Sequence, residues 1–296
     1  MYRILYAFVW VIAWLPLNLL YVFSNFSFYL TYYVLTYRKK VVRENLRLAF
    51  PEKSPAERLE IEKKFFRYFC DVFVETISLM HIGQREMRQR MQFVNVDEVI
   101  EQYENGKSCM LMTAHYGNWE WCSTVSIWLP EGKPLYGIYK QLAMRSFDHL
   151  MCELRMRFTG KVVETNDLVR KMLQLKNQKQ LAMFGMISDQ SPMPSNTHTW
   201  VDFLHQDTIT TVGTEILAKK FDYPVYYAKM TCLKRGYYSC EFIPIALSPK
   251  EMYEHQITAT YMKMLEQTII DNPAYWLWTH KRWKYNRGVS QMPQYK

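Results

Sequence analysis

The sequence predicts an α/β fold in which a mostly parallel central sheet is flanked by helices and preceded by an N-terminal membrane anchor helix. Residues 4–37 contain no charged side chain, and from Asp97 onward short apolar runs alternate with helical stretches. With 296 residues, 49% of them hydrophobic, the chain can bury a large core without disulfides. We therefore divide it into an anchor, residues 1–37, and a domain, residues 38–296.

The most apolar part of the anchor runs from Ile4 to Phe23 and is interrupted only by Pro16 and Asn18. A helix of about 20 residues crosses the hydrocarbon core of a bilayer. The basic run 38–40 directly after it is expected to stay in the cytoplasm, which places the domain on the cytoplasmic side of an inner membrane. Two alternatives remain open: a cleaved signal peptide, and two shorter helices separated at Pro16, one of them lying in the interface.

The order of elements in the domain follows from caps, turns and apolar runs. Ser54, Pro55 and Glu57 form a capping box that opens a helix to about Met80. Helices are then expected to about residue 104 and over residues 118–128, 143–158, 168–176 and 213–221. Strands are expected over residues 108–114, 135–139, 162–164, 181–187, 225–231 and 238–243, the last two as a hairpin closing the sheet.

The net charge of +9 is concentrated in two segments. Residues 38–47 carry five basic groups and one acid, and residues 272–296 carry five basic groups and no acid. In the second segment the cations alternate with Trp and Tyr, which is typical of a surface that meets anionic membrane lipid or an acidic carrier protein. Because an anchor precedes it, we expect no nucleic acid partner. The six cysteines are scattered without zinc-ligand spacing, so no metal is expected.

The residues from His115 to Glu120 carry the candidate chemistry. His115 follows an apolar strand, at the edge of an α/β sheet where ligands bind. Gly117 permits a tight turn and Asn118 can cap the next helix, so Glu120 is expected to fold back beneath the imidazole and fix its tautomer. His115 would then act as a general base. The alternative is a histidine that only satisfies a buried loop.

The hexapeptide H-Y-G-N-W-E resembles the His-x4-acid motif of the glycerolipid acyltransferase superfamily, in the form found in the late acyltransferases of lipid A biosynthesis. Further blocks agree in order and spacing. They are Tyr37–Pro51, Leu154–Lys161, Ser188–Ser191, Thr211–Lys219 and Tyr275–Lys284. The resemblance implies a membrane-bound enzyme that transfers a fatty acyl chain from acyl carrier protein, or a coenzyme A thioester, to a hydroxyl of a membrane lipid acceptor. It implies no cofactor beyond that acyl thioester.

Candidate substrate-binding residues come from the same blocks. Arg155 and Arg157 precede Gly160 at a helix end and are candidates for binding phosphate, or are simply solvated. Asp189 and Gln190 follow an apolar run and either bind polar groups of the acceptor or cap a loop. We add Asn118 and Lys140 as substrate-binding candidates. Lys140 stands where the family often has arginine followed by proline. Lysine binds an anion as a point charge, whereas the planar guanidinium of arginine forms two parallel hydrogen bonds with it.

The acceptor predicted by the resemblance is a lipid A precursor. A lysophospholipid or an aminolipid is the alternative within the same chemistry, because acceptor choice depends on pocket shape. A third hypothesis is a non-catalytic protein that binds lipid or carrier protein, against which the intact His115 and Glu120 argue.

Overall fold

The computed structural model describes residues 2–192, 197–285 and 287, and a seven-stranded sheet forms its centre. The strand order is β1-β9-β8-β2-β5-β3-β4, and every neighbouring pair is parallel except β8 and β9. These strands are β1 (Met91–Val94), β2 (Cys109–Thr113), β3 (Leu135–Tyr139), β4 (Lys161–Glu164), β5 (Met183–Ile187), β8 (Val225–Lys234) and β9 (Tyr237–Ala246). The predicted mostly parallel α/β sheet is confirmed.

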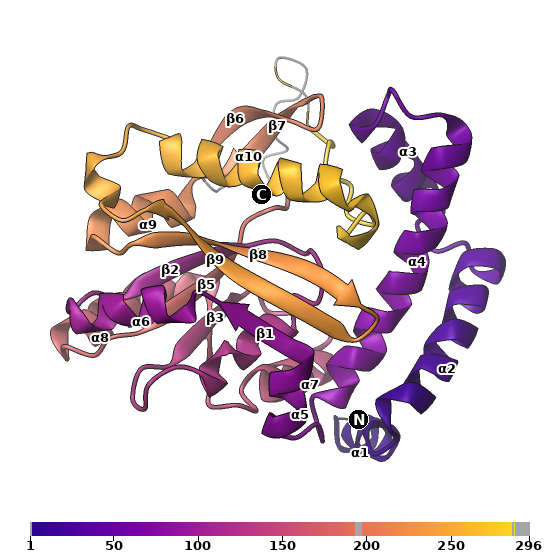
Figure 1. Ribbon diagram of the computed structural model, residues 1–296, viewed down its shortest axis with the longest axis horizontal. Coiled ribbons are helices and arrows are strands. Elements are labelled where there is room, and N and C mark those ends of the chain that lie inside the picture. Colours follow the sequence, from indigo (N-terminus) through magenta and orange to yellow (C-terminus); the bar gives the residue numbers. More distant parts are fainter. Residues whose placement is uncertain (1, 193–196, 286, 288–296) are drawn as a thin grey trace.

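Helices cover both faces of this sheet. Figure 1 shows α9 and α10 on one face and α6 and α7 on the other. The helices after β1 are α6 (Val96–Glu104), α7 (Arg145–Arg155), α8 (Leu168–Asn177), α9 (Gly213–Phe221) and α10 (Gln256–Asp271), and α5 (Gln84–Arg90) precedes β1. A small hairpin of β6 (His198–Phe203) and β7 (Gln206–Thr211) lies beside α10. The apolar core is contiguous through all of these layers.

Two local expectations need correction. The segment 118–128 is not an α-helix but a 3-10 helix over Trp121–Ile127, because Asn118 caps a short, tight turn. The β8–β9 hairpin does not close the sheet at its edge, since β9 also pairs in parallel with β1. Strand β1 was not predicted from the sequence, because its four residues are too short a run to show a period.

The N-terminal segment is broken where Pro16 stands, as one of the alternatives above anticipates. Helix α1 (Tyr2–Ala13) ends before Pro16, and α2 (Leu17–Tyr29) continues into a π-helical turn, Leu30–Val34. In the described part of the chain no single helix has the length and apolarity to span a bilayer. The pair 6–13 and 17–34 meets those criteria jointly, with a bend of 119° between its halves.

Helix α2 packs along α4 (Pro55–Ser78), which begins with the predicted Ser54 capping box (Figure 1). Three hydroxyl groups of the N-terminal segment donate to carboxylates of α4. These are Tyr21 to Glu75 at 2.7 Å, Ser24 to Asp71 at 2.5 Å and Tyr32 to Glu62 at 2.8 Å. Buried hydrogen bonds to charged groups give this contact a fixed geometry.

The opposite side of the N-terminal segment presents large apolar side chains to the outside. Those more than half exposed are Phe8, Val11, Trp14, Val22, Phe23, Phe26, Tyr29, Tyr33, Val34 and Leu35. We call this set the N-terminal apolar face. So many exposed large apolar side chains in one segment are unusual for the surface of a soluble monomer.

The pairing of β2 with β5 positions the functional residues. The two strands are parallel neighbours, with Thr113 opposite Ile187 as the last pair. From β2 the chain continues to β3 on one side, whereas from β5 it continues to β8 on the other. Such a point, where the connections leave in opposite directions, opens a crevice at the carboxyl ends of the strands and is the usual place for a ligand.

Candidate active site

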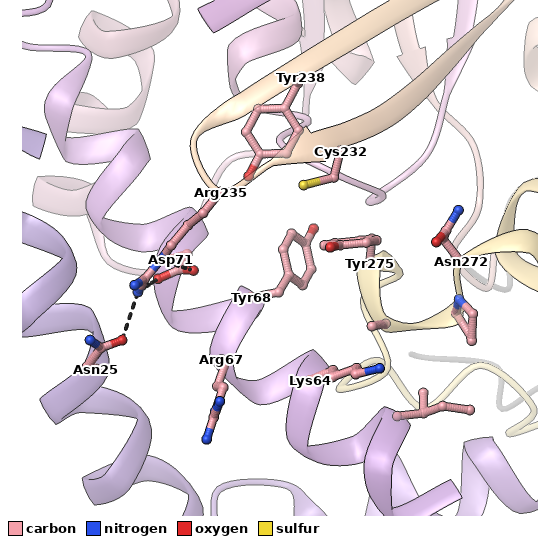
Figure 2. Close-up of a pocket in the computed structure, with 13 residues that line it drawn as sticks. Asn25, Lys64, Arg67, Tyr68, Asp71, Cys232, Arg235, Tyr238, Asn272 and Tyr275 are labelled. Atoms are coloured by element: carbon pink, nitrogen blue, oxygen red, sulfur yellow. Dashed lines mark hydrogen bonds and ion pairs between the residues drawn. The ribbon is translucent and has the colours of Figure 1, made fainter. Parts of the chain in front are cut away.

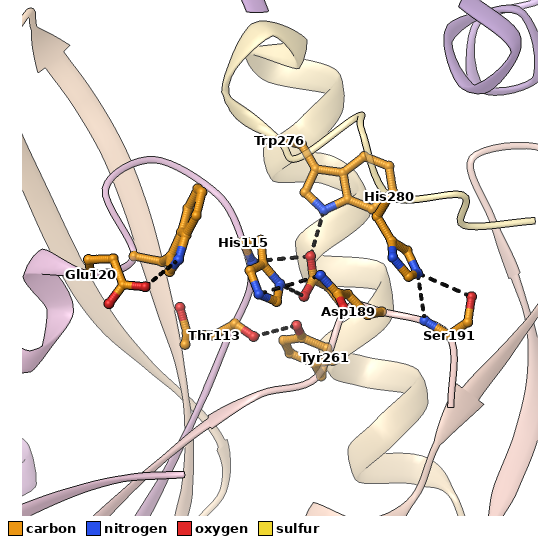
Figure 3. Close-up of polar contacts among 10 residues, drawn as sticks. Thr113, His115, Glu120, Asp189, Ser191, Tyr261, Trp276 and His280 are labelled. Atoms are coloured by element: carbon orange, nitrogen blue, oxygen red, sulfur yellow. Dashed lines mark hydrogen bonds and ion pairs between the residues drawn. The ribbon is translucent and has the colours of Figure 1, made fainter. Parts of the chain in front are cut away.

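His115 and Asp189 meet at the carboxyl edge of the sheet. Each lies two residues beyond its strand, so the register that pairs Thr113 with Ile187 brings these two residues opposite one another. The His115 Nδ1 lies 2.8 Å from Asp189 Oδ1, and the His115 backbone N–H donates to Oδ2 at 3.1 Å (Figure 3). The carboxylate therefore fixes both the ring and the backbone of His115.

Asp189 is only 2% exposed, and both of its oxygens are hydrogen-bonded. Besides His115, the indole Nε1–H of Trp276 donates to Oδ2 at 2.8 Å. Burial alone raises the pKa of this carboxyl, but the His115 ring, the Trp276 indole and the His115 amide outweigh burial and hold the pKa below its usual range. Asp189 is accordingly a carboxylate at neutral pH, which suits a group that orients an imidazole.

The expectation that Glu120 lies beneath the imidazole is wrong. Glu120 accepts from Arg155 instead, with Nε to Oε2 at 2.8 Å and Nη2 to Oε1 at 2.7 Å. The indole of Trp119 also donates to Glu120, at 3.1 Å. Figure 3 shows Glu120 on the far side of His115 from Asp189. The physical reason is the competition for this carboxylate, because a planar guanidinium forms two parallel hydrogen bonds with it.

The backbone between His115 and Glu120 has the predicted turn. Gly117 has φ +55°, and a Cβ at this position would come within 2.3 Å of the Met230 side chain, so both conformation and space require glycine. Asn118 caps the 3-10 helix by accepting from the Trp121 backbone N–H at 3.1 Å. Its Nδ2 donates to Glu75 at 2.7 Å. Because Asn118 is fully buried and bonded at both ends, its prediction as a substrate-binding residue is wrong, and it shapes the loop instead.

Glu75 is a buried acceptor beneath this loop. It receives the Asn118 amide, the Tyr21 hydroxyl from α2 at 2.7 Å and the Tyr238 hydroxyl from β9 at 2.8 Å. Burial raises its pKa to about 7, while the three donors act in the opposite direction. One carboxylate thus joins the N-terminal helix, the sheet and the loop from His115 to Glu120.

The C-terminal segment lies along the same loop. The Leu277 N–H donates to the His115 carbonyl at 3.0 Å, and Tyr116 forms a β-bridge with Trp276. Trp276, Trp278 and Arg282 are 3%, 0% and 1% exposed. The expectation that these residues meet a membrane surface is therefore wrong for these three, which are packed inside the domain. Residues 286 and 288–296 of the predicted basic segment lie outside the described residues.

His280 is half-buried and Arg282 is buried, and both lie close to Asp189. The Ser191 N–H donates to His280 Nε2 at 3.3 Å, and burial lowers the pKa of His280 to about 4, so this ring is neutral at pH 7. Among the described residues no group hydrogen-bonds the Arg282 guanidinium. Burial lowers the pKa of Arg282 to about 10, although the nearby Asp189 carboxylate acts in the opposite direction. Arg282 is still a cation at neutral pH and favours the ionised form of Asp189.

The remaining candidates differ in their distance from His115. Gln190 Nε2 lies 3.5 Å from His115 Nε2, at the limit of hydrogen bonding, so Gln190 belongs to the site. Lys140 directly follows β3 and is exposed. Arg157 is exposed and donates to the Met80 carbonyl at 2.8 Å, which directs it away from Glu120 and its partner Arg155.

Sequence reasoning missed Glu75 and Trp276 as parts of the site. Both act across large sequence separations, on Asn118 and Asp189 respectively. Glu75 was recognisable only as an acid within an otherwise apolar helical stretch, V-F-V-E-T-I. Such an acid requires buried donors, although the sequence does not show which residues supply them.

A partly exposed histidine fixed by a buried carboxylate, at the switch point of an α/β sheet, is an arrangement typical of enzyme active sites. Comparison with known proteins narrows this class. Residues 2–285 match the family model described as bacterial lipid A biosynthesis acyltransferase, and the chain belongs to this family. It is thus an acyltransferase.

Individual relatives agree with the family. The chain is 22% identical to the lipid A biosynthesis palmitoleoyltransferase of Escherichia coli K12 over 260 residues, which cover 87% of this chain and 82% of that protein. It is 22% identical to the lipid A biosynthesis lauroyltransferase of the same organism over 280 residues, covering 93% and 89%. The myristoyltransferase of that organism aligns over 171 residues, again at 22% identity, covering 57% and 51%.

We predict that Arg155→Met destabilises the protein far more than Arg157→Met. Removing Arg155 leaves Glu120 buried without its cation, which costs about 3 kcal/mol, whereas the exposed Arg157 contributes about 1 kcal/mol or less. The free energy of unfolding by chemical denaturation measures both variants against the wild type. Equal losses would contradict the ion pair as described.

We predict that His280 makes the folded state less stable below pH 6.5. Because its folded pKa is lowered to about 4, the unfolded chain binds a proton first as the pH falls, and up to about 3 kcal/mol is lost between pH 6.5 and pH 4. His280→Gln should flatten the stability curve over this range. His149→Gln, at a side chain that is 61% exposed, is the matched control and should leave the curve unchanged.

Proposed function

We propose that this acyltransferase moves a fatty acyl chain from acyl carrier protein to a hydroxyl of a lipid A precursor, with His115 as the general base. The observation that carries the proposal is the contact between His115 Nδ1 and Asp189. A carboxylate acceptor at Nδ1 keeps the proton there, and Nε2 is left with its lone pair. The imidazole is partly accessible, with a side-chain exposure of 22%.

The proton path follows from this tautomer. Nε2 takes the proton of the acceptor hydroxyl as its oxygen forms a bond to the thioester carbonyl carbon. Asp189 stabilises the resulting imidazolium. When the carbon–sulfur bond breaks, the imidazolium returns the proton to the departing thiolate, so the cycle closes with an ester, a free thiol and neutral His115. Since the thioester is already activated, the proposal invokes no metal or further cofactor.

Gln190 and Arg155 are the proposed substrate contacts nearest to His115. Gln190 carries its amide beside His115 Nε2 and can donate to an oxygen bound there. The bonds of Arg155 to Glu120 use Nε and Nη2, and Nη1 forms no hydrogen bond with the described residues. Glu120 therefore holds Arg155 ready for an anionic group of substrate, a role different from supporting the imidazole. We propose that Lys140 and Arg157 bind charged groups of the acceptor or of the carrier protein at a greater distance from His115.

We further propose that the enzyme works at the inner membrane, with the N-terminal apolar face in contact with lipid. The bent pair of helices and the outward apolar side chains support an interfacial position, with α4 holding the inner side of α2. A membrane-embedded acceptor would then reach the sheet edge without leaving the bilayer surface. The exposed lysines Lys281 and Lys284 are available to anionic lipid or to an acidic carrier protein.

Acyl transfer by purified protein tests the proposed chemistry. Acyl carrier protein and coenzyme A thioesters, both radiolabelled, are offered with a lipid A precursor or a lysophospholipid. We expect transfer from acyl carrier protein to the lipid A precursor, and a loss of about 10²–10⁴-fold in His115→Ala. Asp189→Asn should lose activity to a similar extent, because an amide no longer fixes the tautomer.

Each other outcome has a definite meaning. Wild-type rates in His115→Ala contradict the base. Transfer only to lysophospholipid moves the acceptor to the alternative class. If the activity that Asp189→Asn loses is accounted for by its unfolded fraction, measured by thermal unfolding, the variant no longer supports a role of Asp189 in orienting the imidazole.

Vesicle binding tests the proposed membrane contact. Phe23→Glu with Phe26→Glu places two charges on the N-terminal apolar face, and we expect at least tenfold weaker sedimentation with vesicles of phosphatidylcholine and phosphatidylglycerol. The matched control is Ile216→Glu with Ile270→Glu, two residues of α9 and α10 that are each 46% exposed. Equal weakening in both double variants, or in neither, contradicts the proposed contact.

A further inference from the structure

A pocket of about 520 Å³ lies between α2, α4, the turn of the β8–β9 hairpin and the segment 272–275 (Figure 2). Its lining residues are Asn25, Ile61, Lys64, Arg67, Tyr68, Asp71, Cys232, Arg235, Tyr238, Asn272, Pro273, Ala274 and Tyr275. This volume lies within the range of pockets that hold small molecules. None of these residues is bonded to the side chain of His115.

The lining carries more positive than negative charge. The lining contains three cations, Lys64, Arg67 and Arg235, and one acid, Asp71, which already accepts hydrogen bonds from Arg235 and Ser24. Lys64 also pairs with Glu60 at 2.7 Å, but both groups are about two-thirds exposed, and such pairs are weak.

Arg67 has the least satisfied charge of the three cations. Its guanidinium stacks over the Phe28 ring at 5.0 Å, and no hydrogen bond or ion pair is recorded for it in the described part of the chain. Its five N–H donors are thus available, in the planar arrangement that matches a phosphate. The pocket lining therefore offers an unpaired positive charge to an anionic ligand.

The pocket shares its wall with the catalytic loop. The Tyr68 hydroxyl donates to the Gly117 carbonyl at 2.5 Å, and the Gly117 N–H donates to the Tyr275 carbonyl at 3.0 Å. The Tyr116 hydroxyl donates to the Asn272 carbonyl at 3.0 Å. Tyr68 and Tyr275 therefore hold the Gly117 backbone, and Asn272 holds the Tyr116 side chain, so a ligand that orders these lining residues also orders the loop.

We propose that this pocket is a second ligand site, which binds the phosphate ester of a small polar molecule or of a lipid headgroup. Arg67 and Lys64 hold the phosphate at the rim. Asn272 and Tyr275 offer amide and hydroxyl groups to the polar remainder, and Ile61 and Pro273 contact its carbon atoms. The site goes beyond the acyl-transfer proposal and does not depend on it, since binding is measured without turnover.

Equilibrium binding to the full chain in nonionic detergent tests this site. The probe is sn-glycerol 3-phosphate, with glycerol as the uncharged comparison. Arg67→Gln and Lys64→Gln should each weaken binding about tenfold, because each loses a charge-assisted contact. Both side chains are exposed, so the variants are expected to unfold at the wild-type temperature. Lys63→Gln, an exposed lysine of α4 outside the lining, is the matched control and should bind as the wild type does.

The outcomes separate the proposal from its competitors. Equal weakening by Lys63→Gln would show a general charge effect and overturn the site, as would the absence of saturable binding up to about 10 mM. His115→Ala should bind the probe normally, and loss of binding there would mean that the phosphate occupies the acyl-transfer site.

The same variants on vesicles identify the source of the phosphate. Weaker binding of Arg67→Gln to phosphatidylglycerol vesicles, with no change on phosphatidylcholine, supports a lipid headgroup. Unchanged vesicle binding, together with weaker binding of sn-glycerol 3-phosphate, supports a soluble phosphate ester.

Discussion

The parallel pairing of β2 with β5 is the constraint on which the site depends. Its register places His115 and Asp189 opposite one another, two residues beyond the last paired positions. The same pairing buries Asp189, so that a carboxylate which would be costly to desolvate alone is stabilised by three donors from two segments. A shift of the register by one residue would separate imidazole and carboxylate and leave the carboxylate buried without its partner.

The loop that carries His115 is held from several directions, and each contact comes from a different part of the chain. Glu75 fixes Asn118 from below, and the segment around Trp276 pairs with the loop from the side. Because Tyr21 of α2 donates to the same Glu75, the N-terminal helix is part of the support of the loop that carries His115. A displacement of α2 would remove a donor from the fully buried Glu75. Helix α2, which carries part of the N-terminal apolar face, is therefore energetically linked to the loop that carries His115.

Local features of the sequence were predicted more reliably than contacts between distant segments. The strand before His115, the turn at Gly117 and the cap at Asn118 depend on neighbouring residues, and all three are confirmed. The sequence also placed Asp189 at the same edge of the sheet. It did not pair Asp189 with His115, because that pairing depends on which strands are neighbours, and hydrophobic periodicity carries no information about strand order. The buried Trp276 was misinterpreted for the same reason, since composition does not distinguish an interfacial indole from one that reaches a distant carboxylate.

The two carboxylates near His115 are distinguished by the cations that they hold. Glu120 is bonded to an arginine, which keeps its proton at every physiological pH, so this pair is a fixed structural charge. Asp189 is bonded to a histidine, the side chain that serves most often as a general acid and base in enzymes. In the proposed mechanism only the second pair takes a proton from a hydroxyl and returns it to a thiolate within one cycle. The sequence spacing pointed to Glu120 as the partner of the proposed base, whereas the fold places Asp189 on the imidazole and the Arg155 guanidinium on Glu120.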